Sequence, residues 1–166
     1  GITGQVCPKM DSCRVAVFAA DNGVVDEGVS CAPRSVTLQQ AINMTRRRTG
    51  MSAMAAAFGD DVAVVDVGIA GDVPGVGILD RKVRRGTGNI AVEDAMTRPE
   101  ALAAMAAGME QAARARADSI TALGVGEMGI GNTSTSAAVL SALTGADIEA
   151  VTGRGGGLTD AAFEKK

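Results

Sequence analysis

The chain of 166 residues contains neither tryptophan nor tyrosine, and aromatic residues make up only 2% of it. Proteins that bind single-stranded nucleic acids commonly stack the bases on aromatic side chains. A formal net charge of -3 also leaves no excess of positive charge for a phosphate backbone. We therefore expect no nucleic acid among the partners of this protein.

Histidine is absent as well, and the three cysteines, Cys7, Cys13 and Cys31, lack the spacing of metal ligands. Structural zinc sites are built from sets of closely spaced cysteines and histidines, so we expect no metal site here. An odd number of cysteines without a disulfide pattern is typical of reduced thiols. We therefore expect a cytoplasmic protein.

No apolar run is long enough to cross a membrane, and no membrane partner is expected. The first residues, GITGQVCPKMDSCR, do not combine a charged segment with the apolar core of a secretory signal. Neither an internal repeat nor a low-complexity linker is visible. Because 46% of the residues are hydrophobic, the chain can bury a core, and we expect one α/β domain spanning residues 1–166.

Short apolar segments alternate with longer segments of helical spacing. The predicted buried strands are residues 14–20 (RVAVFAA), 62–67 (VAVVDV) and 119–125 (SITALGV), and the predicted helical segments are 36–58 and 98–116. Thr97, Pro99 and Glu100 form a capping box at the start of the last segment. This alternation predicts an α/β fold with an open, mostly parallel, Rossmann-like sheet and helices on both faces.

Open parallel sheets bind ligands outside the carboxyl ends of their strands, and the glycines of this chain gather after the predicted strands. Residues 68–96 read GIAGDVPGVGILDRKVRRGTGNIAVEDAM. This stretch of about 30 residues has no clear periodicity and is longer than most loops in compact domains. Its glycines and paired arginines indicate a functional loop.

Residues 123–136 read LGVGEMGIGNTSTS, in which Gly124, Gly126 and Gly129 give the spacing G-x-G-x-x-G after a strand. Acidic residues within 144–149 follow at the distance found in dinucleotide-binding folds. Glu127, however, would occupy the turn where a pyrophosphate must lie. The dinucleotide interpretation is therefore the weaker one.

A second interpretation makes Asn132 or Thr133 the N-cap of a helix that runs to Leu143. The preceding glycines would then present backbone N–H groups to a single phosphate, and the helix dipole would add attraction. The third interpretation is an ordinary glycine-rich turn followed by a helix cap. Residues 153–157 (GRGGG) form another glycine cluster, and the two clusters could surround one anion if they lie side by side with a lysine.

Six segments together resemble nicotinate-nucleotide:dimethylbenzimidazole phosphoribosyltransferases. They are ADNGVVDEGVS, VTLQQAINMTRRRTG, VVDVGI, RKVRRGTGNIAVEDAMTR, GVGEMGIGNT and GRGGGLTDAAFEKK. The resemblance covers residues 15–166 in the order and spacing of that family. It implies an enzyme that moves ribose 5-phosphate from nicotinate mononucleotide to 5,6-dimethylbenzimidazole, giving nicotinate and α-ribazole 5′-phosphate. It also implies a homodimer that uses no cofactor.

The resemblance assigns roles to particular residues. It implies phosphate contacts at Gly129, Gly155, Gly157 and Lys166. It places Gln40 and Met128 at the base, although for these two an ordinary helix surface and core packing are the alternative. Glu127 would line the site, where its charge would stabilise a developing oxocarbenium.

The chain also departs from the family pattern. Asn22 stands where the family usually has histidine, so only hydrogen bonding is expected there. The family is about twice as long, and its general base is a glutamate in a Gly-Glu-Gly motif that does not follow Lys166. We therefore expect this chain to be the substrate-binding core of the enzyme. The alternatives are a non-catalytic module that binds a nucleotide or α-ribazole phosphate, and a Rossmann dinucleotide enzyme.

Overall fold

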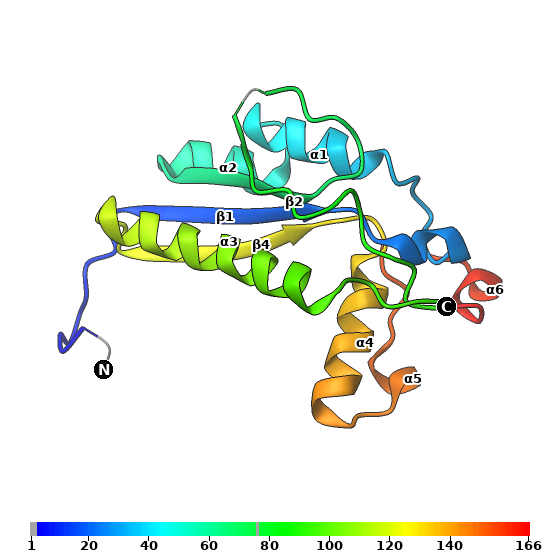
Figure 1. Ribbon diagram of the computed structural model, residues 1–166. Helices are drawn as coiled ribbons and strands as arrows, with labels where there is room; N and C mark the ends of the chain where they lie inside the picture. The colour runs from blue at the N-terminus through cyan, green and yellow to red at the C-terminus, as the bar shows by residue number, and fades with distance from the viewer. Residues whose placement is uncertain (1–2, 76) are drawn as a thin grey trace.

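Four parallel strands form the sheet at the centre of the computed structural model, which describes residues 3–75 and 77–166. The strands are β1 (Cys13–Ala20), β2 (Asp61–Gly68), β3 (Ile78–Asp80) and β4 (Ala122–Met128). Figure 1 shows α1 (Val36–Thr45) and α2 (Gly50–Phe58) on one face of the sheet and α3 (Arg98–Ala117) on the other. The predicted parallel sheet with helices on both faces is confirmed.

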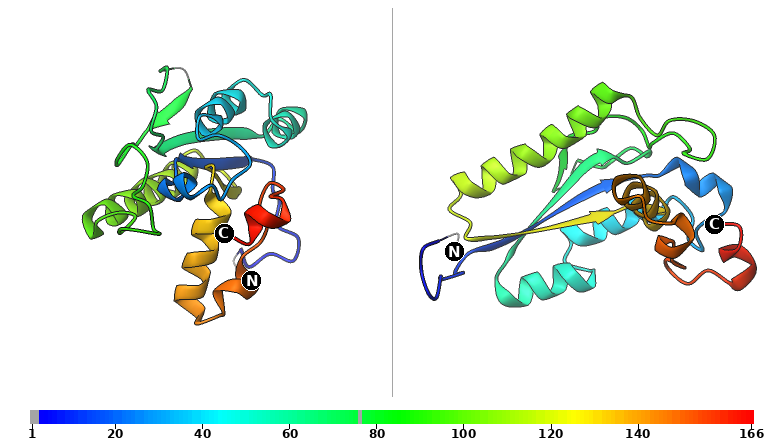
Figure 2. Two further views of the ribbon diagram at one scale, coloured as in Figure 1. Left: turned by 90° about the vertical axis from the view of Figure 1, so that its right-hand side faces the viewer. Right: turned by 90° about the horizontal axis from the view of Figure 1, so that it is seen from below.

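The remaining helices gather at the carboxyl ends of the strands. They are the 3-10 helix η1 (Gly23–Glu27), α4 (Asn132–Thr144), α5 (Ile148–Val151) and α6 (Asp160–Phe163). Figure 2 shows them at one end of the molecule, while the N-terminal segment lies at the other end. None of the helices in the described ranges has the length and apolar character needed to cross a bilayer.

The strand order β3-β2-β1-β4 fixes where a ligand can be expected. The chain moves outward from β1 through β2 to β3, then crosses through α3 and adds β4 on the other side of β1. The direction of winding therefore reverses between β1 and β4. In open parallel sheets the ligand lies in the crevice at this reversal, outside the carboxyl ends of the two strands.

The core lies between the sheet and α1. Ala19, Ala41, Val64 and Ile69 are almost completely buried, and Met128 packs against this cluster from the end of β4. On β2, Val64 and its neighbour Val65 are both buried although they face opposite sides of the sheet, as expected for a parallel strand covered by helices on both faces. Full burial of each such side chain stabilises the fold by about 1.5–3 kcal/mol.

The strands differ from the prediction in two places. β4 begins at Ala122 instead of residue 119 and extends to Met128, because the pairing with β1 continues to Met128. Gly124 and Gly126 therefore lie within a strand, beside Val15 and Val17, so cross-strand pairing has overridden their weak strand propensity. The predicted loop 68–96 also contains β3, which pairs with β2.

The helix starts differ as well. The predicted segment 36–58 is divided, because Thr49 caps α2 through a capping box with Ser52 and Arg47 has a left-handed φ of 59°. At α4 the N-cap is Gly131, with φ 84°, so the expected cap at Asn132 or Thr133 is wrong. The predicted capping box of Thr97 and Glu100 at the start of α3 is confirmed.

Candidate functional site

The backbone is tightly packed where the chain leaves β4. A Cβ atom on Gly129 would lie 2.3 Å from Ala20 O, and one on Gly131 would lie 2.8 Å from Val25 Cγ2. Real side chains do not tolerate such distances, and Gly131 also has a positive φ. These two glycines allow the chain leaving β4 to pass against the end of β1 and against η1 immediately before α4 begins.

The peptide of Ile130, between the two glycines, is held from both sides. Its N–H donates to Thr37 Oγ1 of α1 at 3.1 Å, and its carbonyl accepts from Asn22 Nδ2 at 3.0 Å. The other end of the Asn22 amide, Oδ1, accepts from Thr135 Oγ1 at 2.9 Å. One half-buried amide therefore connects the end of β1 with the first turn of α4.

The glycine loop 153–157 lies against that first turn. Lys166 Nζ donates to Thr133 Oγ1 at 2.8 Å and to Gly153 O at 2.7 Å. A Cβ on Gly155 would lie 2.8 Å from Thr133 Oγ1 and 3.6 Å from Lys166 Nζ. The structure thus brings Gly155, Lys166 and the start of α4 together, although Thr133 and Lys166 are 33 residues apart in the sequence.

The same loop contacts the segment after η1 and carries two glycines with a left-handed backbone. Cys31 Sγ lies 3.5 Å from Gly156 O. Gly155 has a φ of 59° and Gly157 a φ of 106°. The N–H of Gly157 donates to Arg154 O at 3.4 Å, which is a long hydrogen bond within the turn. Gly129 is buried below the first turn of α4.

Lys166 is the charged group of this arrangement. In the described part of the chain no carboxylate side chain forms an ion pair with it, and its two acceptors are a hydroxyl and a carbonyl. Burial lowers the pKa of the Lys166 ammonium from its ordinary value. A cation without a counter-ion, beside the N-terminus of a 13-residue helix, gives the geometry of an anion-binding site.

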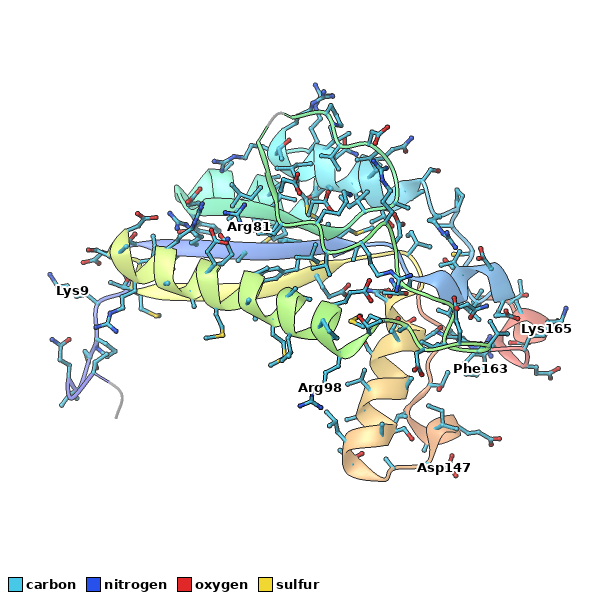
Figure 3. All side chains as sticks on the ribbon, viewed as in Figure 1. Lys9, Arg81, Arg98, Asp147, Phe163 and Lys165 are labelled. Carbon is cyan, nitrogen blue, oxygen red and sulfur yellow. The ribbon has the colours of Figure 1, made fainter. Side chains whose placement is uncertain are left out.

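An open groove of about 630 Å³ adjoins Lys166 between α5 and α6. It is lined by Ile148, Glu149, Thr152, Phe163, Glu164 and Lys166. The apolar side chains of Ile148 and Phe163 give this groove room for an organic group attached to an anion held at Lys166. Figure 3 shows Phe163 at this end of the molecule.

Glu127 lies inside β4, and not in the turn that the dinucleotide interpretation would have required. Its side chain is exposed, and Oε1 accepts a hydrogen bond of 2.6 Å from Asn132 Nδ2, the first residue of α4. The carboxylate therefore contacts the residue next to Thr133, and the hydroxyl of Thr133 contacts Lys166. A glycine-rich pyrophosphate turn is not formed around it, because Gly124 and Gly126 are strand residues.

Gln40 and Met128 are separated from Glu127 by the sheet. Successive strand residues face opposite sides, and Met128 packs toward α1 against the core. Gln40 lies on α1, one turn after Thr37, which accepts from the N–H of Ile130. Gln40 and Met128 thus share the α1 face, while Glu127 is directed to the other face.

The paired arginines belong to a different region, residues 81–89, which we call the arginine segment. Each of its four cations has a carboxylate partner: Arg81 pairs with Glu110, Lys82 with Asp66, Arg84 with Glu100 and Arg85 with Asp72. The hydrogen bond from Arg81, above all, lowers the pKa of Glu110. A groove of about 640 Å³ between this segment and α3 is lined by one complete pair, Arg81–Glu110, and by Lys82 and Glu100.

The arginine segment also supports the end of β1. Thr87 N donates to Asp21 O at 3.0 Å, and Thr87 Oγ1 accepts from Gly23 N at 3.0 Å. Gly88 lies against Gly23 so closely that a Cβ on Gly23 would be 2.5 Å from the carbonyl carbon of Gly88. The segment therefore supports the residues after β1, and a ligand contact by its glycines and arginines stays a prediction.

Sequence reasoning missed several parts of the arrangement. Thr133 was considered only as a helix cap, whereas its hydroxyl contacts Lys166. Thr37 and Thr135 carried no signal, since their hydrogen bonds join residues 93 and 113 positions apart. Among the described residues no group of three or more histidine, cysteine, aspartate or glutamate side chains is placed to hold a metal ion.

The parallel sheet, with its winding reversal between β1 and β4, defines a doubly wound α/β protein whose candidate ligand site lies at the switch point. Residues 1–166 match a family model described as Phosphoribosyltransferase (DBI_PRT). The chain therefore belongs to this phosphoribosyltransferase family, and the resemblance noted in its sequence is confirmed.

Individual relatives agree with this membership. The nicotinate-nucleotide--dimethylbenzimidazole phosphoribosyltransferase of Geobacter sp. (strain M21) is 47% identical over 166 residues, covering 99% of this chain and 48% of that protein. The Clostridium perfringens (strain ATCC 13124) protein of the same name is 46% identical, covering 100% and 46%. The crystal structure of CobT from Thermus thermophilus superposes with a TM-score of 0.94 at 45% identity, covering 99% of this chain and 50% of that one. The chain spans about half the length of the relatives it matches.

Proposed function

We propose that this chain binds nicotinate mononucleotide and transfers its ribose 5-phosphate to 5,6-dimethylbenzimidazole. The reaction is the one that gives its relatives their name. The observation that carries the proposal is Lys166, a cation with no carboxylate partner among the described residues, held between Thr133 and the glycine loop. A nucleotide phosphate supplies the anion that this arrangement lacks.

The proposal assigns the phosphate to Lys166 and to backbone N–H groups of Gly129, Gly155 and Gly157. Two of these glycines, at 155 and 157, have the left-handed backbone that allows a loop to present N–H groups in one direction. Gln40 and Met128 are proposed for the base. Both lie on the α1 face of the sheet, which supports a slot between α1 and the end of β4.

In the reaction, the bond between C1′ of the ribose and the ring nitrogen of nicotinate breaks, and C1′ bonds to a nitrogen of dimethylbenzimidazole. The other nitrogen of that base loses its proton. Glu127, tied to Asn132, offers a carboxylate that would stabilise positive charge developing at C1′. The resemblance places the general base in the part of its relatives that this chain does not span, and loss of a general base costs about 10²- to 10⁴-fold in rate. Turnover by this chain alone is expected to be slow or undetectable.

Assembly and location belong to the same proposal. Large apolar side chains are exposed on α3, on β4 and on α4: Leu102, Met105, Met109, Leu123, Val125, Val139, Leu140 and Leu143. Apolar surface of this kind is typical of protein–protein contacts. We propose that residues 1–166 act as one α/β domain of a cytoplasmic homodimer.

The test uses Lys166→Ala, with Lys165→Ala as the matched control because Lys165 is the exposed neighbouring lysine. Loss of a charge-assisted hydrogen bond corresponds to about 10- to 100-fold weaker binding. Calorimetry should show this loss for nicotinate mononucleotide with Lys166→Ala alone, and neither variant should change the affinity for nicotinate. Chromatography of α-ribazole 5′-phosphate measures turnover in the same samples.

Three outcomes would contradict the proposal. One is equal weakening by both lysine variants, which would indicate nonspecific attraction. Another is a rise in the melting temperature with NAD and none with nicotinate mononucleotide, because a ligand that binds only the folded state stabilises it. A third is tight binding of the mononucleotide without product even when the remaining half of a relative is supplied, which would favour a binding module.

A further inference from the structure

The Asn22 amide is the one side chain described here that joins the end of β1 to the first turn of α4 through both of its polar ends. Asn22 Nδ2 donates to Ile130 O at 3.0 Å, and Asn22 Oδ1 accepts from Thr135 Oγ1 at 2.9 Å. These contacts span 108 and 113 residues of sequence. An amide that uses its donor and its acceptor in this way permits one orientation of the link and one position of the helix start.

The link acts on the part of α4 that holds Lys166. Thr133 lies between Ile130 and Thr135, so both Asn22 contacts flank the residue whose hydroxyl accepts from Lys166. Thr135 Oγ1 also lies 3.3 Å from Gly131 O, the carbonyl of the N-cap. A shift of this turn would therefore move Thr133, Lys166 and the helix N–H groups together.

This turn is fixed by side chains from other elements and not by a cap of its own. Gly131 has a positive φ and no side chain, and α4 has no side-chain hydrogen bond at its N-cap. Apart from the main chain, Ile130 is held by Asn22 and by Thr37 of α1. The first turn of α4 thus depends for its position on Asn22 after β1, on Thr37 of α1 and on Glu127 of β4, in place of a cap of its own.

We propose that Asn22, acting through Thr135, is a positioning residue for the anion site: it fixes the first turn of α4 so that Thr133, Lys166 and the helix N–H groups face one phosphate. Asn22 touches no substrate in this scheme. The inference rests on the proposed function, since it assumes that the anion held at Lys166 is a phosphate. The proposal gives a positioning role to the hydrogen bond between Asn22 and Thr135, which takes no part in the reaction itself.

The experiment compares hydroxyl removal at two ends of the same helix. Thr135→Val removes the hydroxyl that binds Asn22. Thr144→Val is the matched control, because it removes a hydroxyl from the last turn of α4, where Thr144 Oγ1 donates to Leu140 O at 2.7 Å. Inorganic phosphate and nicotinate mononucleotide serve as probes in calorimetry, and urea unfolding records stability in parallel.

Thr135→Val should weaken binding of both probes about fivefold, the loss expected for one hydrogen bond of a buried network. Thr144→Val should bind both probes like the unmodified chain even if it loses as much stability. Thr135→Ser, which keeps the hydroxyl, should restore the affinity. Asn22→Ala should weaken binding at least as much as Thr135→Val, because it also removes the hydrogen bond to Ile130 O. The double variant should lose little more than Asn22→Ala, because the two residues act as one unit.

Unchanged phosphate affinity in Thr135→Val, with weakened affinity in Lys166→Ala, would overturn the positioning role and leave the proposed function standing. Absence of phosphate binding to the unmodified chain would overturn both. If Asn22→Ala does not fold, Thr135→Val and its serine rescue decide the question by themselves.

Discussion

Two basic regions of this protein differ in how their charge is used. The arginine segment has four cations within five residues, and each is paired with a carboxylate. Beside the glycine loop, Lys166 contacts α4, and its two hydrogen-bond acceptors are neutral oxygens. The arginine segment therefore has more cations than the glycine loop, but none of its cations lacks a carboxylate partner that a ligand would have to replace.

The difference shows that the number of basic residues in a loop is a poor guide to an anion site. Cations that are matched by carboxylates hold elements together, as Arg81 does for α3 and Lys82 does for the end of β2. A cation left with a hydroxyl and a carbonyl keeps its charge for a further partner. The two regions lie apart in Figure 3, where Arg81 is beside the sheet and Lys165 is next to α6.

The largest expected effect comes from breaking the buried pair of the arginine segment. The Asp66 side chain is 2% exposed, and its partner is Lys82 Nζ at 2.7 Å. Lys82→Met keeps most of the aliphatic stem but leaves the carboxylate unpaired, which should lower the free energy of unfolding by about 3–5 kcal/mol. Urea denaturation measures this loss, and phosphate affinity of the folded variant should be unchanged.

Arg85→Met is the control for that prediction, because the Arg85–Asp72 pair lies in solvent with side chains 59% and 91% exposed. Exposed pairs contribute little, so this variant should be much less destabilised than Lys82→Met. If Lys82→Met also weakened phosphate binding, the arginine segment would contribute to the anion site, and the two regions would not differ in the way described.

A smaller effect is expected from Gly155→Ala in the glycine loop. Its φ of 59° is left-handed, and the new Cβ would lie 2.8 Å from Thr133 Oγ1. The left-handed backbone should cost about 1–2 kcal/mol, and displacement of Thr133 should weaken phosphate binding. Calorimetry and urea unfolding on the same samples measure both quantities.

Gly153→Ala is the control in the same loop, because a Cβ there meets open space and the backbone has no positive φ. It should change neither the stability nor the phosphate affinity appreciably. Identical behaviour of the two variants would indicate that the loop adapts freely and does not define the site.

The smallest effect concerns pH and Lys166. Burial lowers the pKa of its ammonium in the folded chain below the ordinary value of 10.5. Between the lowered pKa and 10.5 the unfolded chain binds more protons, so the stability should rise with pH in that window. Saturating phosphate should abolish this rise, since a bound anion favours the charged lysine.

Urea unfolding across alkaline pH, with Lys166→Ala as reference, measures this slope. The Lys166→Ala variant should lack the contribution with and without phosphate. A fall in the stability of the unmodified chain relative to Lys166→Ala over the same window would show that the lysine is stabilised as a cation by a partner of its own.

Local signals made much of this fold predictable. The valine-rich runs of β1 and β2 and the capping box at Thr97 are features of a few consecutive residues, and all three predictions held. β3 was not predicted because a strand of three residues owes its existence to pairing with β2. The start of α4 was misplaced because its cap is set by the close approach of Gly131 to Val25, which no local pattern records.

From local pattern alone, the candidate site was predictable only where glycines marked it, and Lys166 was named only through the family resemblance. The clusters around Gly129 and Gly155 pointed to two loops, but their proximity depends on Lys166 reaching Thr133 across 33 residues. The amide link from Asn22 to Thr135 spans 113 residues and leaves no trace in either segment. Likewise, the carboxylates that pair with the arginine segment lie largely on α3 and β2. The sequence alone therefore did not show that its positive charges are neutralised.

β4 has one further consequence, for the handling of the protein in solution. The strand order leaves it at an edge of the sheet, with Val125 76% exposed and Glu127 as its only charged residue. An apolar edge without proline or lysine is a template for pairing with another strand, and such edges promote aggregation. The aggregated fraction should therefore rise steeply with protein concentration. Val125→Lys should raise the concentration up to which the chain stays monodisperse.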